Sequence, residues 1–351
     1  MGGRLPAGRR APIVQSRPVA LPSAIDIHAH FFPERVLDVV RDGGEPFGAR
    51  VDRANAAGPV LSVGDATTPP LASTYWDLDR RVRAMDRAGV AIHALSLTAP
   101  MVYWADGVLG LRLARAVNDA MAEAHVAYPD RFVGCATLPM QDPARAREEL
   151  ERVAGLRGMR AVYLGTNVAG RDLSDPEFAP ILERCEALRL PVLLHPLSTL
   201  GGARLRPFYL SNLLGNPFDT ATAAAHLVFS GTLDRLPRLQ VLLPHAGGAL
   251  PYLAGRLERG QKVRPEAQGR ARRPFTRYLR RFAYDTISHA PGPLRWLVNT
   301  VGADRVMLGS DFCFDMGYER PRDIVTRQLD LKPADQRRIL ADNAARLLAL
   351  A

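Results

Sequence analysis

Four apolar segments of this sequence end in residues that can bind a metal ion. Their last residues are His30, His195, His245 and Asp311. The first segment also carries His28, two residues before its end, and side chains two apart on a strand point to the same side. The imidazoles of His28 and His30 can therefore reach one cation. A histidine pair with a third histidine and a carboxylate suits Zn²⁺, and also Mn²⁺ or Fe²⁺.

Each of these residues also has a purely structural interpretation. A single His-x-His pair is a weak signal, His195 and His245 can each be a packed core histidine, and Asp311 can cap a helix after Ser310. Packing alone does not explain why all of them stand at the ends of apolar segments, so a metal site is the favoured hypothesis. Asp26, two residues before His28, is expected to be structural rather than a ligand.

The elements that must position these residues are strands and helices in alternation. The predicted strands are Ile25–His30, Val90–Leu97, Phe132–Thr137, Ala161–Leu164, Pro191–His195, Gln240–His245, Phe282–Thr286 and Val306–Asp311. The clearest predicted helices are Leu78–Ala88, Leu111–Ala127, Pro143–Val153 and Pro176–Ala187. Eight buried strands separated by helices are typical of an α/β fold, the (β/α)8 TIM barrel. The carboxyl ends of its strands form one face, where active sites lie.

The sequence as a whole predicts one barrel domain over residues 23–351. It follows a predicted disordered leader at residues 1–22, which is rich in Arg, Pro and Ala. Residues 41–73 are rich in Gly and Pro and predict a long irregular loop inserted after the first strand. Three cysteines without paired spacing and no signal-peptide pattern favour the cytoplasm.

The charge of the chain predicts no nucleic-acid partner. The net charge of +10 is carried almost wholly by arginines, which are scattered along helical segments and often stand beside acids. A nucleic-acid surface would cluster its charge and interleave aromatic residues. No segment approaches the roughly 18 uninterrupted apolar residues of a membrane helix, so no membrane association is expected.

Several motifs together resemble the amidohydrolase superfamily, and within it the branch that contains aminocarboxymuconate-semialdehyde decarboxylase. The primary motifs are Ile25–Pro33, His195-Pro196, His245–Gly248 and Gly309–Asp311. Further similarity lies in Tyr75–Asp77, Met85-Asp86, Tyr103–Ala105, Arg131–Gly134, Thr137–Gln141 and Leu214–Thr222. The resemblance extends over residues 24–350.

The resemblance implies an amidohydrolase-type barrel with one divalent metal, most often zinc. By position, it implies that the metal ligands are His28, His30, His195 and Asp311. His245 is then a nearby acid or base, so that His245 and Asp311 form the catalytic group. Arg256 matches an arginine that family dimers lend to the neighbouring active site to hold a substrate carboxylate. A homodimer is therefore expected, and Trp104, in a matching loop, is expected to contact the substrate.

The fourth predicted strand bears on the number of metals. Binuclear members of the superfamily bridge two metals with a carboxylated lysine at the end of this strand. The segment Arg160–Thr166 contains no lysine. A single metal follows.

One segment departs from the decarboxylase of this branch. That enzyme has an arginine and a lysine in the inserted loop, whereas Pro70–Thr74 contains neither. Arg204 and Arg206, after the fifth predicted strand, are the substitutes expected to bind substrate, and Arg50 and Arg53 are alternatives. The departure does not change the predicted reaction class, but it leaves the substrate open.

The predicted function is nonoxidative decarboxylation of an unsaturated or aromatic carboxylic acid, a small-molecule carboxylate. The first alternative is hydrolysis or hydration of a lactone, an amide or a double bond, because the same metal chemistry serves both reactions. The second alternative is a non-catalytic barrel that binds a metal or ligand.

Overall fold

The computed structural model describes residues 23–197 and 200–350, and its centre is a parallel sheet of eight strands. In order around the sheet these are β1 (Ile25–His30), β5 (Ile92–Ser96), β6 (Phe132–Thr137), β7 (Met159–Gly165), β10 (Val192–His195), β11 (Val241–Leu243), β12 (Phe282–Asp285) and β13 (Val306–Met307). Most of their residues are buried on both faces, as expected of strands enclosed by helices. The predicted leader at residues 1–22 lies outside the described residues.

The sheet closes on itself between its first and last strands. The Ile27 amide donates to the Leu308 carbonyl at 2.9 Å, and Ala29 forms a parallel bridge with Phe312. The Asp311 amide donates to the carbonyl of His28, also at 2.9 Å. This closure confirms the predicted (β/α)8 barrel, and it brings the segment after β13 against the two histidines of β1.

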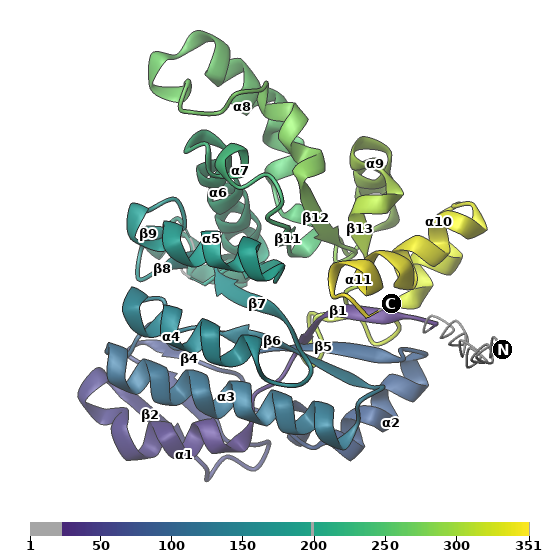
Figure 1. Ribbon diagram of the computed structural model, residues 1–351. Coiled ribbons are helices and arrows are strands. Elements are labelled where there is room, and N and C mark those ends of the chain that lie inside the picture. Colours follow the sequence, from purple (N-terminus) through teal and green to yellow (C-terminus); the bar gives the residue numbers. More distant parts are fainter. Residues whose placement is uncertain (1–22, 198–199, 351) are drawn as a thin grey trace, which may run out of the picture.

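Helices cover the outside of the strands (Figure 1). They are α1 (Glu34–Gly43), α2 (Leu78–Ala88), α3 (Gly107–Ala127), α4 (Pro143–Ala154), α5 (Ala179–Leu188), α6 (Asn216–Phe229), α7 (Thr232–Arg235), α8 (Leu250–Val263), α9 (Pro291–Val301), α10 (Pro333–Arg337) and α11 (Asn343–Leu347). One end of α8 projects away from the other helices in this view. Within residues 23–197 and 200–350, none of the helices combines the length and apolar character needed to cross a membrane.

Two predicted helix boundaries change for local reasons. The helix predicted from Leu111 begins four residues earlier, at Gly107, because the Asp106 carboxylate accepts a hydrogen bond from the Leu109 amide and caps the helix. The helix predicted from Pro176 begins at Ala179, since Pro176–Phe178 forms a separate 3-10 turn.

The insertion after β1 is present, but the prediction of an irregular loop over residues 41–73 was wrong. It contains a small antiparallel sheet of β2 (Ala49–Asp52), β3 (Val60–Val63) and β4 (Ala66–Thr67). Two glycines, Gly48 and Gly64, adopt positive φ at the ends of these strands. The strands are so short that their turn residues dominate the local composition, which hides the alternation of buried and exposed side chains.

Several strands end earlier than predicted, and two of these differences affect candidate site residues. β11 stops at Leu243 because Pro244 has no amide hydrogen to continue the ladder. β13 stops at Met307, because the amides of Gly309 and Ser310 donate to the side chains of Thr286 and Asp26 instead of to a strand. His245 and Asp311 therefore lie in loops just beyond the strand ends.

Candidate metal centre

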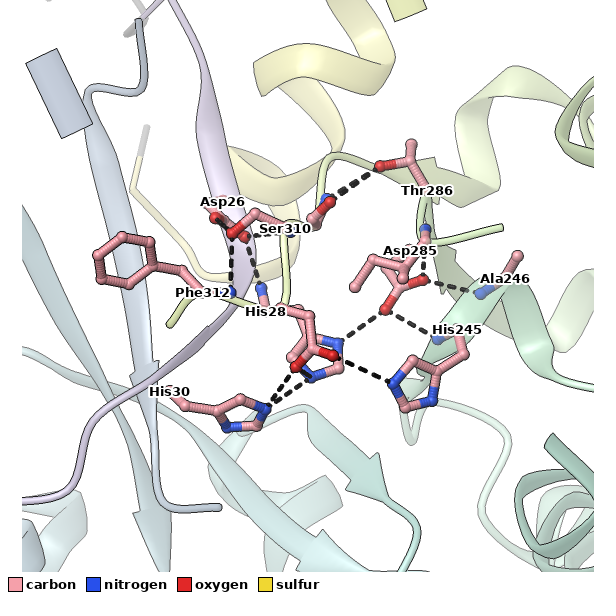
Figure 2. Close-up of polar contacts among 12 residues, drawn as sticks. Asp26, His28, His30, His245, Ala246, Asp285, Thr286, Ser310 and Phe312 are labelled. Carbon is pink, nitrogen blue, oxygen red and sulfur yellow. Dashed lines mark hydrogen bonds and ion pairs between the residues drawn. The ribbon is translucent and has the colours of Figure 1, made fainter. Parts of the chain in front are cut away.

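The two histidines of β1 lie beside each other at the carboxyl end of the barrel (Figure 2), and Asp311 lies close to both. The Nε2 atoms of His28 and His30 are 3.1 Å apart, and His30 Nε2 is 2.9 Å from Asp311 Oδ1. His28 Nε2 lies 3.6 Å from the same oxygen. All three side chains are almost completely buried.

His195, at the end of β10, completes the group from the opposite side of the barrel. Its ring centre is 4.9 Å from that of His30 and 5.5 Å from that of His28. Its Nδ1 lies 2.9 Å from the Pro196 carbonyl, an acceptor that requires a hydrogen on this nitrogen. The lone pair of a neutral His195 is therefore on Nε2.

Asp285, at the end of β12, orients His28, and our reading of the sequence missed it. Its Oδ2 lies 2.8 Å from His28 Nδ1, and its two oxygens also accept the amides of His245 and Ala246, at 2.9 and 2.8 Å. A carboxylate can only accept, so His28 carries a hydrogen on Nδ1 and directs Nε2 toward His30. An acid at the end of a buried strand was the signal available in the sequence.

This arrangement fits a divalent cation. Nε2 atoms and a carboxylate oxygen converge, while the opposite nitrogens of His28 and His195 are occupied by acceptors, as is usual for metal-bound histidines. Asp311 Oδ1 makes no hydrogen bond within the described residues despite its short distance to His30. His28, His195, His245 and Asp311 each offer a ligand atom, and these atoms all lie within 4.8 Å of one another. The described residues thus contain a His/Asp group able to hold a divalent metal.

Burial keeps two of the imidazoles in the neutral form that can coordinate a metal. It lowers the pKa of His30 to about 4 and holds the pKa of His195 well below its usual value. For His28, burial also lowers the pKa, but the hydrogen bond to Asp285 and the charge of Asp311 outweigh it, so the net shift is upward.

His245 and Asp311 share an unusual backbone conformation. Both are in the left-handed region, with φ of 53° and 62°, and so is Ala246 at 55°. Such residues cost about 1–3 kcal/mol each and persist where surrounding contacts enforce them. Here Asp285 binds the amides of His245 and Ala246, and the His28 carbonyl binds the amide of Asp311. His245 Nε2 is thereby held 3.9 Å from Asp311 Oδ2.

A second buried polar group lies behind the histidines. Asp26 accepts the amides of His28 and Ser310 at 3.0 and 3.1 Å, together with the Ser310 hydroxyl. His93 Nε2 is 3.7 Å from Asp26, and His93 Nδ1 is 3.2 Å from the guanidinium of Arg81. Asp26 thus has the structural role that was predicted. Burial raises its pKa to about 6, against the lowering effect of these hydrogen bonds.

Arg81 was also missed at the sequence level. It is completely buried, donates to the His30 carbonyl and lies over the Phe312 ring at 4.8 Å. On α2 it is followed four residues later by the buried Met85. That helical spacing was the signal that Arg81 faces the core rather than solvent.

A cavity of about 460 Å³ opens in front of the histidines and Asp311. Trp104 lines it, as do His195, His245 and Asp311. Its far wall is formed by the inserted sheet, with Leu61, Val63 and Leu71. A second cavity of about 590 Å³ adjoins the first at His245 and Asp311 and is lined by Tyr252 and Trp296.

The arginines expected to bind substrate lie outside both cavities. Arg204, Arg206 and Arg256 are exposed, and none of them lines either of these two cavities. Arg53 binds Glu34 and Asp38 at the surface. The substrate-binding roles of these arginines remain predictions.

Buried imidazoles and a carboxylate at the carboxyl face of a closed parallel barrel define a metal-dependent barrel enzyme. The chain belongs to the amidohydrolase family, whose profile matches residues 25–350. It is 31% identical over 329 residues to 2-amino-3-carboxymuconate-6-semialdehyde decarboxylase of Dictyostelium discoideum, covering 93% of this chain and 91% of that protein. It is 33% identical over 304 residues to gamma-resorcylate decarboxylase of Polaromonas sp., covering 82% of this chain and 92% of that protein.

Solved structures of decarboxylases have the same fold. The 5-carboxyvanillate decarboxylase of Sphingomonas paucimobilis matches with a TM-score of 0.80 and 28% identity, over 94% of this chain and 99% of its own. A dihydroxybenzoic acid decarboxylase of Polaromonas sp., solved with manganese and 2-nitroresorcinol, matches with a TM-score of 0.74 and 26% identity, over 94% of this chain and 98% of its own. The predicted family and its decarboxylase branch are therefore confirmed.

Proposed function

We propose that the protein is a metal-dependent, nonoxidative decarboxylase of aromatic or unsaturated carboxylic acids. The observation that carries this proposal is the convergence of His28, His30, His195 and Asp311 in front of a cavity. The decarboxylase names of the relatives support the reaction class. In the reaction, the bond between the carboxylate and its carbon breaks, CO2 leaves, and that carbon gains a proton.

His28, His30, His195 and Asp311 are the ligands that we propose for one divalent ion. The three imidazoles are buried, whereas His245 is more exposed and borders both cavities. Three nitrogen donors and one oxygen suit zinc, which we expect, while manganese is the ion in a related structure. When bound, such an ion supplies Lewis-acid polarisation of the substrate.

His245 is the acid or base in this proposal. It lines the cavity, its Nδ1 has no hydrogen-bond partner among the described residues, and Nε2 faces Asp311 at 3.9 Å. A proton held on this imidazole is available to the carbon that loses CO2. The carboxylate of Asp311 stabilises the His245 imidazole while it holds this proton.

Arg256 reaches the active site of a second subunit in this proposal. It is exposed on α8, forms no ion pair or hydrogen bond with another described residue, and lines neither of the two cavities. Exposed apolar side chains that suit a subunit interface lie on the same side, among them Tyr252 and Trp296 beside the second cavity. A planar guanidinium is well matched to a carboxylate.

The test is CO2 release from carboxyl-labelled aromatic acids by protein loaded with zinc or manganese. We expect release with metal and its loss after chelation, and His195→Ala should reduce bound metal and lower kcat/KM by about a thousandfold, since the metal contributes several kcal/mol. His226→Ala, on the surface of α6, is the matched control. Incorporation of ¹⁸O from water into the product without CO2 release would identify a hydrolase instead.

Subunit mixing tests the role of Arg256. Arg256→Ala and His195→Ala variants should each be impaired alone, but their mixture should be more active than the sum of the two separate variants, because one site of the hybrid dimer keeps both groups. A monomer in light scattering, or no recovery on mixing, would contradict this role.

A further inference from the structure

The cavity in front of the candidate metal centre has neither an arginine nor a lysine among the described residues that line it. The lining instead includes the acid Asp315, which is exposed and forms no ion pair or hydrogen bond with another described residue. A second carboxylate on the substrate would therefore lose water without gaining a cation and would approach a like charge.

One edge of the cavity offers hydrogen bonds without charge. Asn212 and Asn216 lie four residues apart, in a π-helical turn (Ser211–Gly215) and at the start of α6. Both are half-buried and line the cavity, and neither carboxamide forms a hydrogen bond with another described residue. Each can donate to or accept from a hydroxyl group.

Much of the remaining lining is apolar. Leu61 and Val63 of β3, with Leu71 after the inserted sheet, lie in one wall, and Trp104 and Phe314 also line the cavity. These surfaces favour an aromatic ring and small uncharged substituents such as methyl groups. The cavity thus combines an apolar slot with a neutral polar edge.

We propose that the cavity selects aromatic acids with one carboxylate and uncharged ring substituents, and discriminates against dicarboxylates. This inference rests on the proposed function, in which the carboxylate is held by the metal centre and by Arg256 of the partner subunit. No arginine or lysine among the described lining residues remains for another carboxylate. Of the compounds in the relatives' names, gamma-resorcylate fits this description, whereas 5-carboxyvanillate and 2-amino-3-carboxymuconate-6-semialdehyde, with two carboxylates each, do not.

The test uses three 2-hydroxybenzoates that differ only at position 6, which carries a hydroxyl, a methyl or a carboxylate group: 2,6-dihydroxybenzoate, 6-methylsalicylate and 3-hydroxyphthalate. With metal-loaded protein, we expect kcat/KM for decarboxylation to be at least tenfold lower for the dicarboxylate than for either other compound. Equal or faster turnover of the dicarboxylate would overturn the proposal while leaving the decarboxylase function intact.

If no compound is decarboxylated, that result counts against the proposed function itself. The substrate class can still be tested by measuring how tightly the same compounds bind. Calorimetry on the metal-loaded protein should then give a Kd at least tenfold weaker for 3-hydroxyphthalate than for 6-methylsalicylate. Equal or tighter binding of the dicarboxylate would overturn the substrate class independently of catalysis.

Two variants test the residues. Asp315→Asn should raise kcat/KM for the dicarboxylate relative to 6-methylsalicylate by at least threefold, because a like charge is removed. Asn212→Leu should lower kcat/KM for 2,6-dihydroxybenzoate relative to 6-methylsalicylate by about three- to tenfold, the value of one neutral hydrogen bond. Glu319→Gln, an exposed acid outside the cavity lining, is the control and should change neither ratio. Unchanged ratios in both test variants would overturn the proposal.

Discussion

The active-site face has a floor, formed by the histidines, Asp311 and the residues buried behind them, and a rim of exposed arginines. These two parts are built in different ways. On the floor, His28 and Asp311 contact partners from distant parts of the same chain, and Asp285 and Arg81 are buried behind them. On the rim, Arg204, Arg206 and Arg256 are exposed and outside the cavity. The floor is thus complete within one chain, whereas the rim offers cations that its own cavity does not use. Substitutions on the floor should therefore affect stability and metal binding, and those on the rim should affect activity alone.

The largest effect is expected at Arg81. Arg81→Met leaves Asp26 buried without its nearby cation and removes the donor to the His30 carbonyl. Leaving a buried acceptor without its donor costs about 1–3 kcal/mol, and more for a charged group, so urea unfolding should measure a loss of about 3 kcal/mol. Arg184→Met, at an exposed ion pair with Glu151, is the control and should cost about 1 kcal/mol or less. Equal losses in the two variants would contradict the distinction between floor and surface.

The next effect concerns Asp285, which orients His28. Asp285→Asn weakens the acceptor at His28 Nδ1, and loss of such a partner typically lowers metal affinity about 10–100-fold. Competition with a chelator measures the affinity. Asp315 lies four residues after Asp311 without a contact to the histidines, so Asp315→Asn should leave the metal affinity unchanged. An unaltered metal affinity in Asp285→Asn would show that Asp285 does not contribute to metal binding.

The rim arginines should separate by activity. Arg256→Ala should lower kcat/KM by about tenfold or more, since a hydrogen bond to a charged group contributes about 1.5–3 kcal/mol. Arg204→Ala and Arg206→Ala should each change it less than threefold if the partner subunit supplies the cation. A larger loss of kcat/KM in Arg204→Ala or Arg206→Ala than in Arg256→Ala would indicate that the loop after β10 binds the carboxylate. All three variants should unfold at the same urea concentration as the original protein.

The smallest effect is a pH dependence of stability through His93. Burial beside Arg81 holds the pKa of His93 well below its usual value. Below about pH 6.5 the unfolded chain binds a proton on this imidazole and the folded protein does not, so the free energy of unfolding falls as the pH decreases. In His93→Gln this fall between pH 7 and 5.5 should be smaller by about 1 kcal/mol. Parallel curves for both proteins would show that His93 is protonated when folded.

The floor was largely predictable because its residues follow from strand periodicity. His28 and His30 share one face of β1, and His195 ends β10, so barrel topology alone implies that they converge. His245 and Asp311 were assigned to strands, whereas both lie in loops with left-handed backbone. Asp285 and Arg81 were missed because their significance depends on partners distant in the sequence, at His28 and His30.

The sequence by itself determined the barrel, the set of candidate metal-binding side chains and the family, since local periodicity and short motifs encode them. Only the tertiary structure decided which tautomers the histidines adopt, because Asp285 and the Pro196 carbonyl accept their Nδ1 hydrogens. It also decided that the cavity lining lacks a cation within the described residues. The direction of a loop side chain is set by packing between distant segments, and neither composition nor spacing records that packing.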